Sequence, residues 1–311
     1  MQNIKLFIEL TRLNKPIGFM LLFWPCIWGL TLAYDFALSL EIFIFYGALF
    51  FSGSVLMRSA GCIVNDISDK NFDKLVERTK DRPIASGKIS IRLAAIYASI
   101  LCAVAFLVLI NFNKFTILMA LISMPLAFTY PLMKRFTYWP QLFLGITFNY
   151  GLVLAWISIK NDISLIPIIF YFGAIFWTLG YDTIYGYQDI KDDEIIGVKS
   201  TSIKFKNNPK KFVLICYLTF IASLILIGLL MKFSLFYFLF LIFSFFQLIF
   251  FQIYKLNVND PMSCLSKFKS NNFVGLIIFG NPFLSSASIA ASFENATVTL
   301  GVGTPAFCNS I

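Results

Sequence analysis

Long apolar runs separated by short polar segments constrain this chain of 311 residues more than any other feature. A helix needs about 20 predominantly apolar residues to cross a bilayer. Hydrophobic residues make up 59% of the chain and charged residues only 13%, which excludes a soluble globular domain. The sequence therefore predicts an all-α polytopic membrane protein with spans at 17–34, 40–64, 93–111, 115–130, 139–158, 164–181, 212–231 and 233–254.

Basic residues are distributed unevenly over the loops that these spans define. The N-terminal segment and alternate loops hold 21 of the 25 Lys and Arg residues, and the intervening loops hold three. Short cytoplasmic loops of membrane proteins carry such an excess. The pattern predicts a cytoplasmic N-terminus, and it explains the net charge of +9 without nucleic acid as a partner.

Cysteine and histidine usage narrows the possible chemistry. The six cysteines are scattered without a CxxC pair, so no disulfide framework is predicted. The chain has no histidine, which excludes His-dependent nucleophilic triads and His-ligated zinc or haem. Carboxylates are therefore the obvious metal ligands.

Two acidic segments, 65–73 and 182–193, follow apolar runs on the same predicted side of the membrane. Helical continuation would align polar residues on one face of each segment: Asn65, Asp69 and Asp73 in the first, and Asp182, Asp189 and Asp193 in the second. Like charges at these spacings repel, so each set requires a positive charge nearby. Two such clusters favour divalent cations with oxygen ligands, most simply magnesium carrying a phosphate group.

Arg58 is the only Lys or Arg inside a predicted span. It lies on the stripe of the first acidic segment, about 10 Å deeper than Asn65 at the helical rise. An intramembrane Arg is costly and usually faces a polar cavity, where its fixed fork suits a carboxylate. The basic residues of loop 77–88 allow two interpretations, membrane topology or closure over a diphosphate.

This combination of residues is suited to diphosphate chemistry. Divalent cations and Lys/Arg side chains neutralise the charge that develops on a departing diphosphate. If the diphosphate leaves an allylic carbon, the product is a resonance-stabilised cation that needs no protein nucleophile. The hydrocarbon tail of such a substrate would lie in the membrane.

Several stretches carry a resemblance to a known family, over about residues 5–279. They read RLNKPIGFMLLFWPCIWGL, RSAGCIVNDISDKNFD with RTKDRPIASGKIS, YPLMKRFTYWPQLFLGITFNYGLVLAW, YDTIYGYQDIKDDEIIGVKSTSIKF and CLSKFKSNNFVGLIIF. The chain resembles the UbiA family of membrane prenyltransferases. The amino-acid sequence around the acidic motifs resembles that of the 4-hydroxybenzoate branch of the family. The resemblance implies a bundle of eight to nine transmembrane helices with a cytoplasm-facing active-site cavity.

The resemblance also implies roles for individual residues. The metal and diphosphate motifs would comprise Asn65, Asp69 and Asp73, with Asp182, Asp189 and Asp193. Phosphates would be held by Lys134, Arg135, Arg82 and Lys199. The aromatic acid would face Arg58, with Asn14 as helper. The residues implied to act in catalysis are Asp69, Asp73, Asp189, Asp193 and Arg135.

The implied reaction is Mg²⁺-dependent transfer of a polyprenyl group from its diphosphate to the ring of 4-hydroxybenzoate, in ubiquinone biosynthesis. The attack is expected ortho to the hydroxyl. The partners are these two substrates and the lipid bilayer, and no protein partner is inferred. Because no Arg- and Ser-rich transit segment precedes the first span, we expect the inner membrane of a bacterium.

The C-terminal residues depart from the family pattern. Residues 273–279 begin the expected ninth span, but Gly-Asn-Pro follows at 280–282, and the remainder is rich in Ser, Ala, Thr and Gly. We therefore divide the chain into a transmembrane domain, 1–279, and an atypical, altered C-terminal tail, 280–311, that replaces most of the ninth helix.

Alternative functions stay open at this point. The acceptor could be a naphthoate, homogentisate, haem or chlorophyllide. A cation-coupled transporter is a different class, but transporters place ionisable groups near the membrane midplane rather than at its edge. A purely structural membrane protein would leave the two aligned acidic motifs unexplained.

Overall fold

The computed structural model describes residues 2–35 and 39–282, and this part of the chain is helical without β-strands. Its elements are α1 (Gln2–Thr11), α2 (Ile17–Ala33), α3 (Leu40–Ser68), α4 (Lys70–Asp73), α5 (Ile91–Leu109), α6 (Lys114–Thr129), the 3₁₀-helix η1 (Tyr130–Arg135), α7 (Pro140–Lys160), α8 (Leu165–Gly186), the 3₁₀-helix η2 (Tyr187–Asp189), α9 (Ile190–Ile196), α10 (Thr201–Lys204), α11 (Pro209–Leu230), α12 (Leu235–Phe246), the π-helix η3 (Gln247–Tyr254) and α13 (Pro261–Lys269). Residues 271–282 form a further helix.

Each predicted span coincides with a helix. Within the described residues, seven helices are long and apolar enough to cross a bilayer, and α2 is a shorter apolar helix of 17 residues. The protein is therefore a multi-pass membrane protein. The largest difference from the predicted ends is in α8, which runs to Gly186 rather than 181. α3 also runs further than predicted, to Ser68 rather than 64, because its last turn enters the polar network described below.

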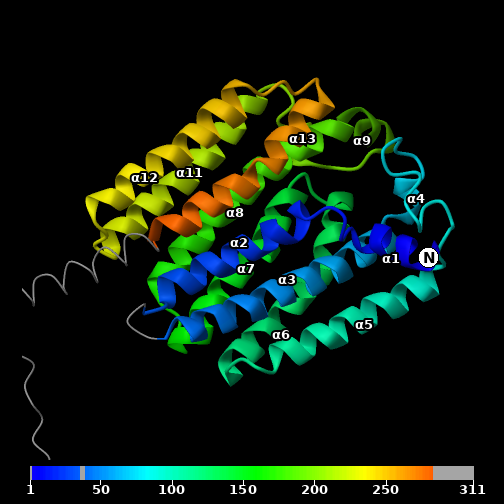
Figure 1. The fold of residues 1–311 in the computed structure, drawn as a ribbon. Helices are drawn as coiled ribbons and strands as arrows, with labels where there is room; N and C mark the ends of the chain where they lie inside the picture. Colours follow the sequence, from blue (N-terminus) through cyan, green and yellow to red (C-terminus); the bar gives the residue numbers. More distant parts are fainter. Residues whose placement is uncertain (1, 36–38, 283–311) are drawn as a thin grey trace, which may run out of the picture.

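The helices form a layered bundle (Figure 1). α2, α7, α8 and α11 pack in succession, with α3, α5 and α6 on one side and α12 on the other. A Cβ atom at Gly29 would lie 2.2 Å from the carbonyl oxygen of Leu152, so glycine is required where α2 crosses α7. The absent side chain permits the close backbone approach that sets the position of α2.

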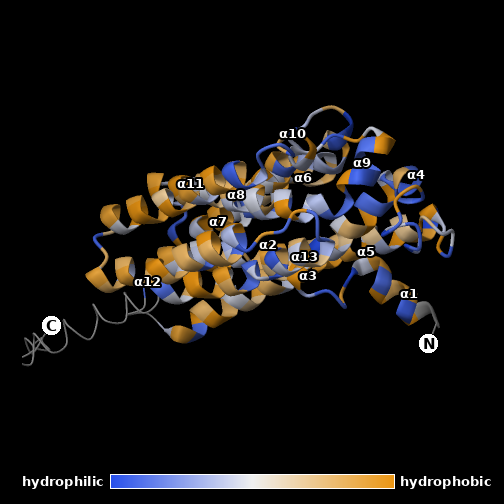
Figure 2. Ribbon diagram, turned by 90° about the horizontal axis from the view of Figure 1, so that it is seen from above, coloured by the Kyte–Doolittle hydropathy of each residue, from blue (hydrophilic) through white to orange (hydrophobic). Residues whose placement is uncertain are grey.

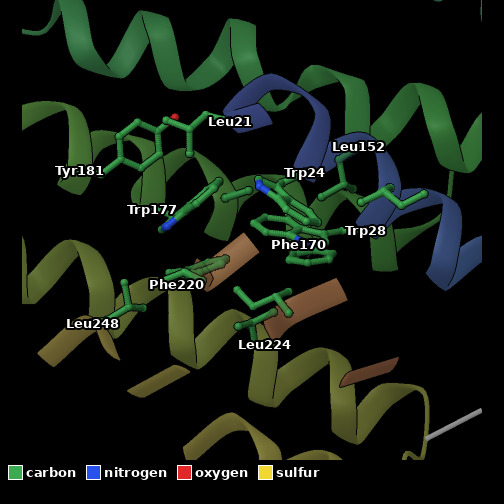
Figure 3. Close-up of a cluster of buried hydrophobic side chains, with 14 of the residues drawn as sticks. Leu21, Trp24, Trp28, Leu152, Phe170, Trp177, Tyr181, Phe220, Leu224 and Leu248 are labelled. Carbon is green, nitrogen blue, oxygen red and sulfur yellow. The ribbon is translucent and has the colours of Figure 1, made fainter. Parts of the chain in front are cut away.

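An aromatic cluster fills the centre of the bundle (Figure 3). Trp28 stacks on Phe170 at a ring-centroid distance of 5.4 Å and contacts Trp177 at 4.9 Å. Trp177 stacks on Phe220 at 5.9 Å. Aromatic pairs contribute about 0.5–1.5 kcal/mol each beyond their burial. The cluster therefore joins α2, α8 and α11 into one core.

The C-terminal helix of residues 271–282 packs into this core through polar contacts. The indole of Trp24 donates to the side-chain oxygen of Asn272 at 2.9 Å, and that of Trp28 donates to the carbonyl of Gly275 at 2.9 Å. Trp177 donates to Asn271 at 2.8 Å. The start of the expected ninth span is thus a helix anchored to α2 and α8. Residues 283–311 lie outside the described residues, so the altered tail stays a prediction.

Polar residues gather at one end of the bundle. Figure 2 shows the hydrophilic positions concentrated around α4 and α9, while the long helices are predominantly hydrophobic. On the outer helices, large apolar side chains are exposed, including Leu107 of α5 and Leu118 of α6. Their exposure is consistent with contact to lipid rather than water. Both acidic segments lie at the polar end (Figure 1).

Candidate active site

A cavity of about 950 Å³ opens between the two acidic segments. Eleven of the twelve predicted site residues line it: Asn14, Arg58, Asn65, Asp69, Asp73, Arg82, Lys134, Asp182, Asp189, Asp193 and Lys199. Arg135 does not line the cavity. Its guanidinium donates to the carbonyl of Ser68 at 2.6 Å and lies 5.4 Å from the ring of Phe72, so it braces the end of α3.

The first acidic segment keeps the predicted stripe although α3 ends within it. Asp69 interrupts the helix with φ −98° and ψ 5°, and α4 follows directly. The amide of Asp69 nevertheless donates to the carbonyl of Asn65 at 2.9 Å, and that of Asp73 donates to Asp69 at 2.8 Å. The i, i+4 spacing therefore continues across the break.

Cations from η1 and from the loop after α4 neutralise this stripe. Lys134 of η1 lies 2.7 Å from the carboxylate of Asp69, and Arg82 lies 2.8 Å from that of Asp73. Arg82 also lies 3.2 Å from the carboxylate of the buried Asp66. Arg12, which follows α1, forms a second ion pair with Asp66. Without these partners the neighbouring carboxylates would repel one another. Arg12 was not among the predicted site residues because nothing in its local sequence indicates the contact.

The donor set of this stripe fits a hard divalent cation. The buried Oδ1 atoms of Asn65 and Asp69 have no hydrogen-bond partner, and the amide of Asn65 donates to the other oxygen of Asp69 at 3.2 Å. Burial raises the pKa of Asp69, and Lys134 opposes that shift. Unpartnered buried oxygens of this type are ligands that magnesium accepts. Across the described ranges, however, no three acidic or thiol side chains converge closely enough to form a complete metal site.

The second acidic segment is not one continuous helix, as its predicted stripe required. α8 ends at Gly186, a 3₁₀ turn spans Tyr187–Asp189, and α9 follows. A Cβ atom at Gly186 would lie 2.4 Å from the hydroxyl of Ser202, so this turn is packed tightly against α10. The tighter turn changes the angular spacing of its residues, yet Asp182, Asp189 and Asp193 all line the cavity.

A basic residue that was not predicted connects the two halves of the site. Arg78, in the loop after α4, donates through Nε to both carboxylate oxygens of Asp189, at 2.8 and 3.0 Å. It also donates to the hydroxyl of Tyr185 at 3.1 Å. Beside it, the amide of Glu77 donates to Asp192 at 3.3 Å. The excess of cations in loop 77–88 was visible in the sequence, but no spacing pattern distinguishes Arg78 from its neighbours.

Deeper in the cavity, Arg58 is held by apolar contacts and has an unused donor. Its guanidinium carbon lies 5.3 Å from the ring centroid of Phe148, and its Nε is buried without a hydrogen-bond partner. A Cβ atom at Gly18 would lie 2.9 Å from that Nε. The arginine therefore lies directly against the start of α2, and it has one buried donor that no group in the described residues uses. Asn14 lines the cavity at an exposed position of the same segment.

The charges of the cavity wall balance. The lining contains eight acidic residues, Glu9, Asp66, Asp69, Asp73, Asp81, Asp182, Asp189 and Asp193. It also contains eight basic residues, Arg12, Lys15, Arg58, Arg78, Arg82, Lys134, Lys199 and Lys269. These formal charges cancel, so a highly charged anion that entered the cavity would need additional cations to compensate its charge.

The chain also matches a family of known proteins. The model of the UbiA prenyltransferase family matches residues 22–277. The chain belongs to this family. A mitochondrial 4-hydroxybenzoate polyprenyltransferase of Bos taurus is 42% identical over 276 residues, which cover 88% of this chain and 73% of the relative. The 4-hydroxybenzoate octaprenyltransferase of Psychromonas ingrahamii is 40% identical over 278 residues, which cover 89% and 95%.

Solved UbiA structures share the fold. A UbiA homologue from Aeropyrum pernix superimposes with a TM-score of 0.66 at 22% identity, covering 90% of this chain and 98% of that one. A homologue from Archaeoglobus fulgidus bound to GPP and Mg²⁺ gives a TM-score of 0.62 at 16% identity, covering 91% and 99%. The predicted all-α UbiA-type membrane fold is confirmed.

Proposed function

We propose that the protein transfers a polyprenyl group from an allylic polyprenyl diphosphate to 4-hydroxybenzoate, forming a carbon–carbon bond ortho to the hydroxyl and releasing diphosphate. The single observation that carries the proposal is the layered cavity, which has two acidic motifs with paired cations at its mouth and Arg58 below them. The 4-hydroxybenzoate prenyltransferases among its relatives support the choice of acceptor.

The cations of the cavity mouth would bind the diphosphate. In the structure, Lys134 neutralises Asp69 and Arg82 neutralises Asp73. The backbone of Lys199 is fixed beside them, because its amide donates to the carbonyl of Lys134 at 2.9 Å. With the carboxylates engaged in holding a metal ion, these cations would be free to bind phosphate oxygens instead. Charge-assisted bonds of this kind are stronger than neutral ones.

Asn65, Asp69 and Asp73, with Asp182, Asp189 and Asp193, would hold Mg²⁺, whose chemistry is to neutralise charge on a departing diphosphate. The homologue from Archaeoglobus fulgidus that binds both GPP and Mg²⁺ supports this ion. The residues that line the cavity would supply orientation and exclusion of water. They orient the allylic carbon toward the acceptor and keep water from the cation that forms when the carbon–oxygen bond breaks.

Arg58 would orient the acceptor by its carboxylate. Its Nε is an unused buried donor, and the ring of Phe148 beside it offers an apolar surface to an aromatic ring. The ring carbon ortho to the hydroxyl then attacks the allylic carbon, and the ring proton is lost to restore aromaticity. Asp189 could polarise the phenol, a role separate from metal binding.

We further propose that the protein resides in the inner membrane of a bacterium, with its N-terminus and cavity mouth on the cytoplasmic side, and that its product belongs to ubiquinone biosynthesis. The basic loops that predict this orientation support it. Relatives occur in mitochondria as well as in a bacterium. Accessibility of single cysteines in loops 77–88 and 160–164 to a membrane-impermeant thiol reagent would test the orientation.

The experiment that tests the activity is prenyl transfer in membranes that contain the full-length protein. Labelled 4-hydroxybenzoate and a long-chain allylic diphosphate are supplied with and without Mg²⁺, beside an Asp69→Asn variant expressed at the same level. We expect prenylated 4-hydroxybenzoate only with wild-type protein and Mg²⁺. Naphthoate and homogentisate are included as competing acceptors.

The outcomes separate the parts of the proposal. Product from another acceptor but none from 4-hydroxybenzoate would overturn the acceptor and retain prenyl transfer. Product formed equally by Asp69→Asn would overturn the assignment of the site. Well-expressed protein that forms no product from any acceptor would overturn the activity.

A further inference from the structure

A second cavity lies away from the acidic one and shares none of its lining residues. It has a volume of about 710 Å³ and lies between α12–η3 and the helix of residues 271–282. Its wall on the first side is formed by Phe240, Phe243, Phe246, Gln247, Phe250, Phe251 and Lys255. Its wall on the second side is formed by Phe273, Leu276, Ile277, Phe279 and Gly280. We call it the phenylalanine groove.

The phenylalanine groove opens toward the bilayer rather than into the bundle. Phe243 is 62% exposed and Leu276 is 52% exposed, and both belong to apolar helices. Residues 240–255 span at most about 22 Å, because the π-helix η3 rises less per residue than an α-helix, compared with about 30 Å for a hydrocarbon core. The groove is therefore long enough for an acyl chain that starts near the membrane surface.

Two lysines stand at the end of the groove that lies beside α13. Lys255 lines the groove itself. Lys267 is only 7% exposed, and its ammonium lies 3.7 Å from the ring centroid of Phe251, which also lines the groove. In the described part of the chain, neither lysine has a carboxylate within 4.0 Å. Burial lowers the pKa of Lys267, and the nearby Lys255 lowers it further.

Lys267 is a largely buried residue close to a second cation, and the ring of Phe251 compensates its charge only in part, so an anion at this place would be favourable. The long apolar groove beside them indicates what carries that anion. We propose that the phenylalanine groove binds an anionic phospholipid, with one acyl chain along the phenylalanines and its phosphate held by Lys255 and Lys267. A zwitterionic lipid fits less well, because its own ammonium competes for the phosphate and is repelled by the two lysines.

The test uses full-length protein purified in an uncharged detergent, with bound lipids counted by native mass spectrometry. Phosphatidylglycerol and phosphatidylcholine with identical acyl chains are titrated separately. Two lysines near a membrane surface predict a preference for phosphatidylglycerol of about tenfold or more. Lys255→Gln and Lys267→Gln should each reduce this preference, and the double variant should abolish it. Lys211→Gln, an exposed lysine that does not line the groove, should not change it.

A second pair of variants tests the groove without touching the charges. Leu276→Trp fills the groove at a half-exposed position and should weaken binding of both lipids. Leu229→Trp, at a similarly exposed position of α11 outside the groove, should have no effect. These variants keep the test decisive if Lys267→Gln lowers the yield of folded protein.

Three results would overturn the proposal. The first is equal binding of the two lipids by wild-type protein. The second is binding of phosphatidylglycerol that appears only after removal of residues 283–311, which would make the chain's own C-terminal segment the occupant. The third is a dimer that Leu276→Trp dissociates, which would make a second copy the occupant.

Discussion

Arg78 and Asp189 connect the two acidic segments of this protein, because the guanidinium Nε donates to both carboxylate oxygens at 2.8 and 3.0 Å. Arg78 belongs to the loop that follows the first segment, and Asp189 is part of the second. The pair therefore fixes the distance between two halves of a cavity that are far apart in sequence. It also occupies both oxygens of a carboxylate that we propose as a metal ligand.

We expect Arg78→Ala to lower kcat/KM for the allylic diphosphate by about 10- to 100-fold, the usual cost of removing a residue that orients a metal ligand. Arg78→Lys should restore part of the activity because the charge returns without the bidentate geometry. Lys80→Ala is the matched control, since Lys80 is exposed and its ion pair within the described residues is with Glu77 of the same loop. Steady-state kinetics at varied diphosphate concentration measure the effect. Equal losses in the two alanine variants would contradict a positioning role for Arg78.

Asp193 and Asp192 provide a direct comparison within the second segment. Asp193 lines the cavity, whereas Asp192 accepts a hydrogen bond from the amide of Glu77. We expect Asp193→Asn to reduce kcat by about 100-fold or more, in the range found for the loss of one electrostatic group at a reaction centre. It should also raise the Mg²⁺ concentration needed for half-maximal rate. Asp192→Asn should leave that concentration within about twofold, as for other exposed polar contacts. If Asp193→Asn and Asp192→Asn need the same Mg²⁺ concentration for half-maximal rate, Asp193 does not have the proposed role in metal binding.

The proposed role of Arg58 in binding the acceptor's carboxylate can be tested with acceptors that have or lack this group. Arg58→Gln should raise KM for 4-hydroxybenzoate by about tenfold or more, because a charge-assisted bond of the carboxylate is lost. KM for the prenyl diphosphate should change little. The methyl ester of 4-hydroxybenzoate has no carboxylate, so wild-type and variant enzymes should use the ester with similar efficiency. A variant that loses the same factor with acid and ester would show that Arg58 does not bind the carboxylate.

Gly18 provides an independent test of the position of Arg58. A Cβ atom there would lie 2.9 Å from the Arg58 Nε, so Gly18→Ala must displace the guanidinium. We expect a higher KM for the acceptor without loss of thermal stability, because alanine favours a helix by up to about 1 kcal/mol over glycine. Gly53→Ala in α3, where no atom lies within 4 Å of the added Cβ, is the control and should not affect KM. Comparable acceptor KM values for both alanine variants would refute the contact argument.

Asn271 should be a stability determinant of the C-terminal helix. Its side-chain oxygen accepts from Trp177 at 2.8 Å and from Gln252 at 3.1 Å. Asn271→Leu leaves two buried donors unpaired, at a cost of about 1–3 kcal/mol for each. The melting temperature of the detergent-purified protein should therefore fall by several degrees. Asn111→Leu, at an exposed loop position, should change it little. An unchanged melting temperature for Asn271→Leu would show that these hydrogen bonds make no net contribution to the stability of the fold.

Local patterns in the sequence were sufficient for much of this description. Every long apolar run predicted a helix, and the i, i+4 spacing of Asn65, Asp69 and Asp73 predicted a stripe that the backbone keeps. The need for cations beside these acids also followed from charge repulsion alone. The identity of the cations did not, because the fold of the loop after α4 brings Arg82 to Asp73, and the packing of η1 against α3 brings Lys134 to Asp69.

The second segment shows the limit of periodicity. A helical repeat placed Asp182, Asp189 and Asp193 on one face, but the 3₁₀ turn at Tyr187–Asp189 breaks the helix there. At the start of this turn Gly186 lies tightly against Ser202 of another helix, where a Cβ atom would not fit. A one-dimensional pattern cannot contain that contact.

The sequence by itself determined that this protein is a multi-pass helical membrane protein with two acidic segments, since hydropathy and helical periodicity are properties of neighbouring residues. Only the tertiary structure decided that Arg78 meets Asp189, that Arg58 lies against Gly18, and that a phenylalanine groove ends at two lysines. Helices that are apolar on all sides do not indicate which face packs inward. Contacts between distant segments are therefore set by the packing of the whole bundle.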